Sequence, residues 1–167
     1  STTESSYDAT ININPSLGTE ILSGLNLFGG ASTIAKNSGK GTLEEDQYQG
    51  VGGVTYEIGP VSLGWQVSGV STGEESTEGY NAYKSHAFGM SFNVNDDLSL
   101  SYGVHESEQS KGSGDASTTL ETSSLQVAYS MGGMSIKAAM SDVSNASYST
   151  AAANDYDVNT IAVSLAF

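Results

Sequence analysis

The last eight residues of the chain, 160–167, read Thr-Ile-Ala-Val-Ser-Leu-Ala-Phe. Successive side chains of an extended strand point to opposite faces, so Ile161, Val163, Leu165 and Phe167 share one face. The opposite face carries only Thr, Ala and Ser side chains. Chain ends usually fray in water unless they are tied into a sheet. The sequence therefore predicts a closing β-strand with one strongly apolar face and one small, mildly polar face.

The same alternation recurs upstream and predicts nine β-strands in all. Tight turns near residues 15, 59, 96 and 132 join the first eight of these strands into four hairpins. Long polar connections are predicted at residues 31–46, 71–83, 106–119 and 141–157. Tight and long connections thus alternate along the chain, with a period of roughly one strand pair and its loop.

The two faces of the predicted strands differ in chemistry. Over the predicted strands the apolar faces carry no Asp, Glu, Lys or Arg, whereas the strands of a water-soluble sandwich carry charges on their outer face. The opposite faces are too small and polar to fill a dry core, so we expect them to contact water. An apolar exterior around a polar interior is typical of membrane-spanning barrels. We predict an all-β fold, an antiparallel transmembrane β-barrel, in which residues 1–167 form a single domain.

Charge excludes one class of partner. The 167 residues include 19 acidic and 5 basic side chains, for a net charge of -14, and no Cys. Binding to nucleic acid needs clustered Lys and Arg, so no nucleic-acid partner is expected. The acidity either keeps a solvated surface soluble or attracts cations. No run of about 18 apolar residues predicts a transmembrane helix.

Four segments resemble the C-terminal half of a bacterial outer-membrane general porin of the alphaproteobacterial type. They are Ile-Gly-Pro-Val-Ser-Leu-Gly at 58–64, Leu-Ser-Leu-Ser-Tyr-Gly-Val at 98–104, Leu-Gln-Val-Ala-Tyr-Ser-Met-Gly-Gly at 125–133, and the closing residues 161–167. The resemblance implies a sixteen-stranded barrel, usually a homotrimer, in contact with outer-membrane lipid. Such a channel lets small hydrophilic solutes diffuse passively and has no cofactor. The closing residues, Ile161, Val163, Leu165 and Phe167, would act as its assembly signal.

The number of predicted strands indicates whether the chain supplies a whole barrel. Single-chain bacterial barrels have even numbers of strands, and nine are predicted here. We therefore expect the chain to supply strands eight to sixteen of the porin architecture, with the remaining strands outside this sequence.

A porin needs a polar wall, and five residues are predicted to line it. They are Glu20, Glu57, Gln66, Gln126 and Lys137. Two acids against one base predict a weak preference for cations. The alternative function is a non-conducting surface or assembly protein whose acidic loops bind a partner or further copies of the chain.

Other candidate sites have weaker support. Acidic residues of two long connections, Glu44, Glu45, Asp46, Glu74, Glu75 and Glu78, are candidate ligands for Ca²⁺ at a pore mouth, or else simply solvated. The two histidines, His86 and His105, are predicted on different strands and opposite faces, without a third ligand for a metal. No serine stands in a nucleophile motif. The sequence predicts no enzyme.

Overall fold

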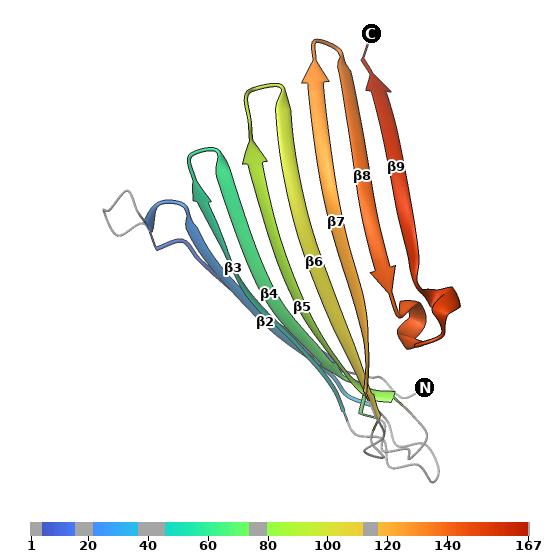
Figure 1. The fold of residues 1–167 in the computed structure, drawn as a ribbon. Helices are drawn as coiled ribbons and strands as arrows, with labels where there is room; N and C mark the ends of the chain where they lie inside the picture. Colours follow the sequence, from blue (N-terminus) through green and yellow to red (C-terminus); the bar gives the residue numbers. More distant parts are fainter. Residues whose placement is uncertain (1–4, 16–21, 37–45, 74–79, 112–116, 167) are drawn as a thin grey trace.

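The computed structural model describes residues 5–15, 22–36, 46–73, 80–111 and 117–166. These residues form one nine-stranded antiparallel sheet in which every strand pairs with the next along the chain, as Figure 1 shows. The strands are β1 Ser6–Ile13, β2 Leu25–Ile34, β3 Gln47–Ile58, β4 Val61–Ser71, β5 Tyr80–Asn93, β6 Leu98–Lys111, β7 Thr118–Met131, β8 Met134–Ser144 and β9 Tyr156–Leu165. The prediction of an all-β antiparallel fold is confirmed.

The sheet is curved but not closed into a barrel (Figure 1). Within the described residues, β1 pairs only with β2 and β9 pairs only with β8. Both outer strands therefore present one edge without a neighbouring strand. No helix among the described residues is long and apolar enough to span a membrane.

Local chemistry explains the short turns. Ile58 pairs with Val61 across Gly59-Pro60, and Met131 pairs with Met134 across Gly132-Gly133. Gly59 and Gly132 have φ of 55° and 57°, a left-handed conformation that favours glycine. Between β5 and β6, the Asn95 side chain accepts hydrogen bonds from the backbone N–H groups of Asp97 and Leu98, at 2.9 and 2.8 Å. These turns lie at one end of the sheet with the C-terminus, and the long connections lie at the other end (Figure 1).

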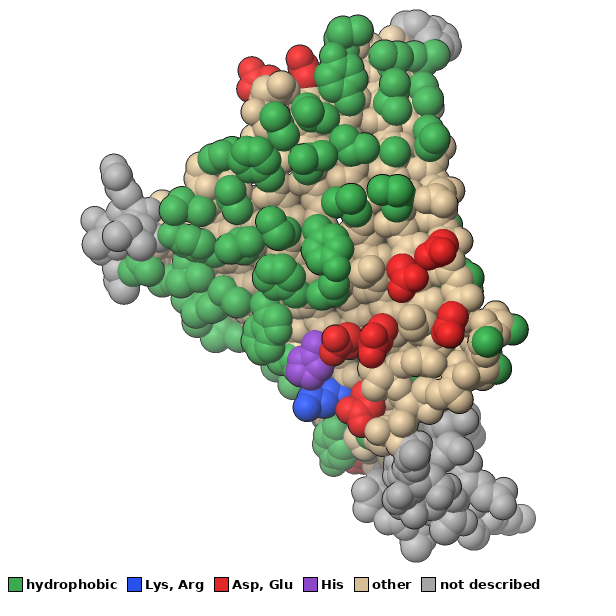
Figure 2. Space-filling model, viewed as in Figure 1, with side chains coloured by type: hydrophobic (Ala, Val, Ile, Leu, Met, Phe, Trp, Pro, Cys, Tyr) green, Lys and Arg blue, Asp and Glu red, His purple; other side chains and the backbone are tan. Residues whose placement is uncertain are grey.

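The strand register joins the apolar residues into one surface. Directly paired residues of neighbouring strands point to the same face, and the pairs include Trp65 with Phe88, Met90 with Tyr102, and Leu100 with Val127. We call this side of the sheet the apolar face; Figure 2 shows it as a nearly continuous hydrophobic area. The opposite side, which carries mainly Gly, Ser, Gln, Thr and Ala, is the polar face.

This sheet has no hydrophobic core of its own. Among the described residues no hydrophobic side chain is buried, whereas Ser107 and Gln109 of the polar face are. Large apolar side chains are exposed instead, up to 77% for Ile161. Most of them lie on the apolar face, which no part of the described chain covers.

Three strands are longer than predicted. β5, β6 and β7 have 14 residues each, so part of the stretch predicted as a loop at residues 106–119 is strand. β2 likewise runs to Ile34, although the prediction ended it before Ala31. Polar composition was interpreted as loop, but a strand with both sides in water needs no apolar residue to keep its backbone ladder.

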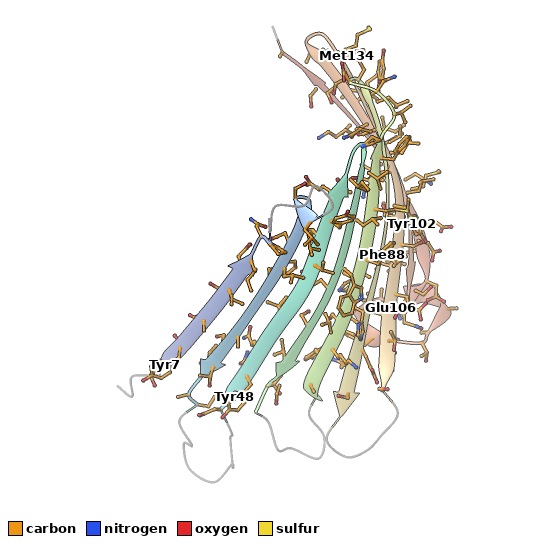
Figure 3. The ribbon with its side chains drawn as sticks, turned by 90° about the vertical axis from the view of Figure 1, so that its left-hand side faces the viewer. Tyr7, Tyr48, Phe88, Tyr102, Glu106 and Met134 are labelled. Atoms are coloured by element: carbon orange, nitrogen blue, oxygen red, sulfur yellow. The ribbon has the colours of Figure 1, made fainter. Side chains whose placement is uncertain are left out.

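The added strand ends place charges on the apolar face, so the expectation of a charge-free face is wrong at the end near the long connections. Glu106 pairs with both His86 and Glu121, and Glu108 pairs with Lys84. Figure 2 shows these charged groups beyond the hydrophobic area, and in Figure 3 Glu106 lies farther from the short turns than Tyr102. The acids on this face are Glu106, Glu108, Glu121, Asp142 and Asp157.

Candidate functional site

The polar face is the candidate site because hollows lie on it, including one of about 400 Å³ beside the short turns, lined by Asn95, Ser99 and Ser130 among others. One hollow of about 520 Å³ spans β1 to β4 and is lined by Asp8, Gln49 and Gln66, among others. A smaller one of about 110 Å³ spans β6 to β9, with Gln126, Lys137 and Thr160 in its wall. Small and apolar residues supply most of the exposed lining of these last two hollows, and the Gln, Ser, Thr and Lys side chains among them can hydrogen-bond water and polar solutes.

The structure places four predicted wall residues on this face. Gln66 lies in the larger hollow, and Gln126 and Lys137 share the smaller one. Glu57 is exposed near the Gly59 turn, outside both hollows. Glu20 lies outside the described residues.

The charges of this wall are far apart. Glu57 is on β3 and Lys137 on β8, which at a strand spacing of about 4.8 Å separates them by about 24 Å along the sheet. That distance exceeds the Debye length of about 8 Å at physiological salt, so neither charge neutralises the other.

The predicted loop acids are not assembled into a metal site in the described structure. Asp46 accepts a hydrogen bond from the backbone N–H of Lys36 at 3.2 Å, which ties together the two ends of the β2–β3 connection. The other candidate cation ligands, Glu44, Glu45, Glu74, Glu75 and Glu78, lie outside the described residues. Within the described part of the chain no group of three or more His, Cys, Asp or Glu residues could hold a metal ion.

The two histidines lie on opposite faces, as predicted. His86 pairs with Glu106 on the apolar face, and His105 pairs with Ala87 and Thr122 on the polar face. Their separation by the sheet prevents them from acting on one substrate or one ion.

Two pairs of like charges lie directly opposite each other on the apolar face, Glu106 with Glu121 and Asp142 with Asp157. Asp142 lies beyond Met140, the last apolar residue of β8 on this face, and so outside the hydrophobic area. A side-chain hydrogen bond with Asp157 raises the pKa of the Asp142 carboxyl, and loss of hydration and the negative charges of Asp157 and Asp155 raise it further. The opposed carboxylates therefore repel each other when both are ionised.

The connection between β8 and β9 reaches over the polar face, which the sequence did not reveal. It contains two short 3-10 turns, η2 Ala146–Tyr148 and η3 Ala152–Asn154. The Tyr148 hydroxyl lies 2.8 Å from Oγ of Ser107 on β6, and its ring centre lies 5.6 Å from that of Tyr83 on β5. A single Tyr in a Ser- and Ala-rich stretch has no periodicity that would have predicted this contact.

The closing strand exposes its apolar side chains on the apolar face. Ile161, Val163 and Leu165 are 77%, 59% and 65% exposed. Phe167 lies outside the described residues. The assembly role of these residues stays a prediction.

No protein-family model matches the chain, and no curated protein matches it significantly. The fold and faces define a class in structural terms: an antiparallel β-sheet with an exposed apolar face opposite a polar, hollowed one.

Proposed function

We propose that the protein is a porin of the bacterial outer membrane, a water-filled channel for passive diffusion of small hydrophilic solutes. The observation that carries the proposal is the uncovered apolar face opposite a polar face. Soluble monomers rarely expose contiguous apolar patches beyond a few hundred Å², yet this face extends across all nine strands. Lipid is the partner that would cover it without leaving polar groups unpaired.

The proposal includes closure of the sheet into a barrel. Unpaired backbone N–H and C=O groups cost several kcal/mol each in hydrocarbon, so the free edges of β1 and β9 need strand partners in a bilayer. Further strands, sixteen in total by the porin resemblance, would provide them. A homotrimer is proposed on the same resemblance.

The height of the apolar face is compatible with a bilayer. On β3 the apolar face carries no charged side chain from Tyr48 to Ile58, ten residue steps, which is about 34 Å along the strand and about 24 Å of height at a tilt near 45°. On β6 the uncharged stretch from Leu98 to Val104 is shorter. Glu106, the first acid beyond it, follows Leu98 by eight residue steps, about 27 Å along the strand and about 19 Å of height at the same tilt, so the apolar band is narrower on β6 than on β3.

The proposed channel prefers cations weakly. Among the side chains that the structure describes on the strands, the polar face carries Asp8 and Glu57 against Lys137. The acids of the apolar face point away from this wall, so they act only through the diffuse field at the channel mouth. Their contribution should fade in salt as the Debye length falls from about 10 Å at 0.1 M to about 3 Å at 1 M.

The test is conductance of the complete protein, as its host makes it, in a planar lipid bilayer. We expect stepwise conductance and, across a salt gradient, a reversal potential that indicates weak cation selectivity at 0.1 M salt. Glu57→Gln should reduce this selectivity more than Glu106→Gln, which removes the same charge from the apolar face. A folded, membrane-inserted protein without conductance would refute the proposal and favour the surface or assembly role, and anion selectivity at low salt would refute the cation preference.

A further inference from the structure

A cluster of polar side chains holds the β8–β9 connection against the polar face. Tyr148 contacts Ser107 and Tyr83, although its own connection begins at the end of β8. Because β7 lies between β8 and β6 in the sheet, the Tyr148 side chain has crossed above β7 to reach β6 and β5. The connection therefore overhangs the sheet at its long-connection end.

The residues beneath Tyr148 form a satisfied hydrogen-bond network. Ser85 donates to Oγ of Ser107 at 2.9 Å, and Nε2 of Gln109 donates to the Tyr83 hydroxyl at 2.8 Å. Ser107 and Gln109 are 5% and 8% exposed, the two buried polar side chains of the described structure. Burying polar groups costs free energy unless they are hydrogen-bonded, and here each has a partner. The contacts with Ser107 and Tyr83 therefore hold the Tyr148 ring in a defined position.

The base of the connection is also fixed. The backbone N–H of Asn145 donates to Oδ1 of Asp155 at 2.8 Å, which joins the two ends of the connection. The Asn145 side chain donates to the carbonyl of Thr119 at 2.8 Å and so attaches the same point to β7. With both base and tip bonded, the connection is held in one arrangement.

The backbone supports this interpretation. Asn145, Ser147 and Tyr148 have φ of 54°, 58° and 55°, in the left-handed region where a non-glycine residue costs about 1–3 kcal/mol. Such conformations persist when surrounding contacts over-determine them. The hydrogen bonds at Tyr148 and Asn145, at about 1 kcal/mol net each, together with the ring contact, offset this strain.

We propose that the β8–β9 connection is a fixed constriction in which Tyr148 limits the size of solutes at the long-connection end of the channel. The inference rests on the proposed porin function. The ring occupies space above the polar face that would otherwise be open to solutes. Ser107 and Gln109 beneath the ring are buried and hydrogen-bonded within the protein, so they hold Tyr148 in place.

A structural test is independent of conduction. The chain has no Cys, so paired cysteines at Ser107→Cys and Tyr148→Cys can be joined selectively by a short bifunctional thiol reagent in the complete, folded protein. We expect efficient cross-linking of this pair. Glu106→Cys with Tyr148→Cys is the matched control, because residue 106 is adjacent in sequence but on the opposite face. Equal cross-linking of both pairs, or of neither, would refute the inward position of the connection.

A functional test then measures single-channel conductance and the diffusion of sugars of increasing size into liposomes. Tyr148→Ala should raise the conductance and increase the entry of the larger sugars most. Tyr148→Phe keeps the ring and should remain close to the parent protein in both measurements. If the parent protein conducts and Tyr148→Ala leaves size selection unchanged, the constriction is refuted and the porin stands. If the cross-link forms but no variant conducts, both proposals are refuted.

Discussion

At the scale of single residues, Gly53 of β3 illustrates how the polar face tolerates a large ring. Phe28 of β2 pairs with Gly53, and its side chain lies over the glycine. A Cβ at this position would lie 2.9 Å from Cε1 of Phe28 and 2.7 Å from the carbonyl oxygen of Trp65. The ring of Phe28 can shift, but the backbone carbonyl of Trp65 cannot move without disturbing the β3–β4 ladder.

We therefore expect Gly53→Ala to destabilise the folded protein by about 1–3 kcal/mol, the usual cost of overpacking. Gly89 on β5 is the control, since a Cβ there meets nothing within 4 Å. Gly89→Ala should be neutral or stabilise by about 0.5–1 kcal/mol, because alanine loses less backbone entropy on folding. Thermal unfolding of both variants in detergent measures the difference. Equal effects would contradict the packing of Phe28 over Gly53.

The opposed carboxylates of Asp142 and Asp157 predict a pH-dependent stability. The folded state raises the pKa of Asp142, so the stability associated with its proton is fully present below the unfolded pKa, about 3.9, and is lost as the pH rises through the folded pKa. Asp142→Asn removes the repulsion and should raise the unfolding temperature at pH 7. The gain should shrink on acidification below about pH 4.

The control for this effect is Asp8→Asn. Asp8 has Ser32 opposite it in the register rather than a second acid, so its substitution should not stabilise the protein at pH 7. Unfolding temperatures recorded at pH 7 and pH 3 for both variants decide the matter. A gain for Asp142→Asn that is equally large at both values would show that repulsion between the carboxylates is not its cause.

At the scale of elements, most strands and the turns near residues 59, 96 and 132 were predictable because each has a strong local signal. The tight turn predicted near residue 15 is wrong, because β1 ends at Ile13 and β2 begins only at Leu25. Period-two alternation gave nine strands and the correct face for residues such as Trp65 and Leu100. The pairs Gly59-Pro60 and Gly132-Gly133 predicted two tight turns, and in both turns the first glycine has the positive φ that glycine adopts readily. These are local effects of sterics and side-chain direction, so one sequence is enough to recognise them.

The ends of the strands near the long connections were not predictable in the same way. Residues 106–111, Glu-Ser-Glu-Gln-Ser-Lys, are all charged or polar, so they have no apolar side to distinguish a strand from a loop. What makes them strand is pairing with β5 and β7, a non-local contact. The position of the Tyr148 side chain also depends on a non-local contact, since its hydrogen-bond partner Ser107 is 41 residues away in sequence. Glu57, Gln66, Gln126 and Lys137 lie on the polar face, as strand alternation alone predicts, and their role in a channel wall stays a prediction.

At the scale of the whole molecule, the two faces of the sheet need different surroundings: the apolar face is stable away from water, and the polar face is stable in contact with it. A soluble sheet would bury one face against a second layer, but the described residues form one layer with both faces exposed. Covering the apolar face with lipid and the polar face with water satisfies both. The free edges of β1 and β9 are then the remaining unsatisfied feature, and closure of the sheet would remove them.

A bilayer around the apolar face makes a prediction that separates two neighbouring residues of β7. Val127 lies on the apolar face between Leu125 and Tyr129, and Gln126 lies on the polar face in the smaller hollow. Val127→Arg should destabilise the membrane-inserted protein by about 2–4 kcal/mol, the cost of a charged side chain at the bilayer midplane of a barrel. Gln126→Arg should cost little, because its guanidinium remains in water. Denaturant unfolding from lipid vesicles measures both, and equal losses would place the two faces in similar surroundings and rule out a bilayer on one side alone.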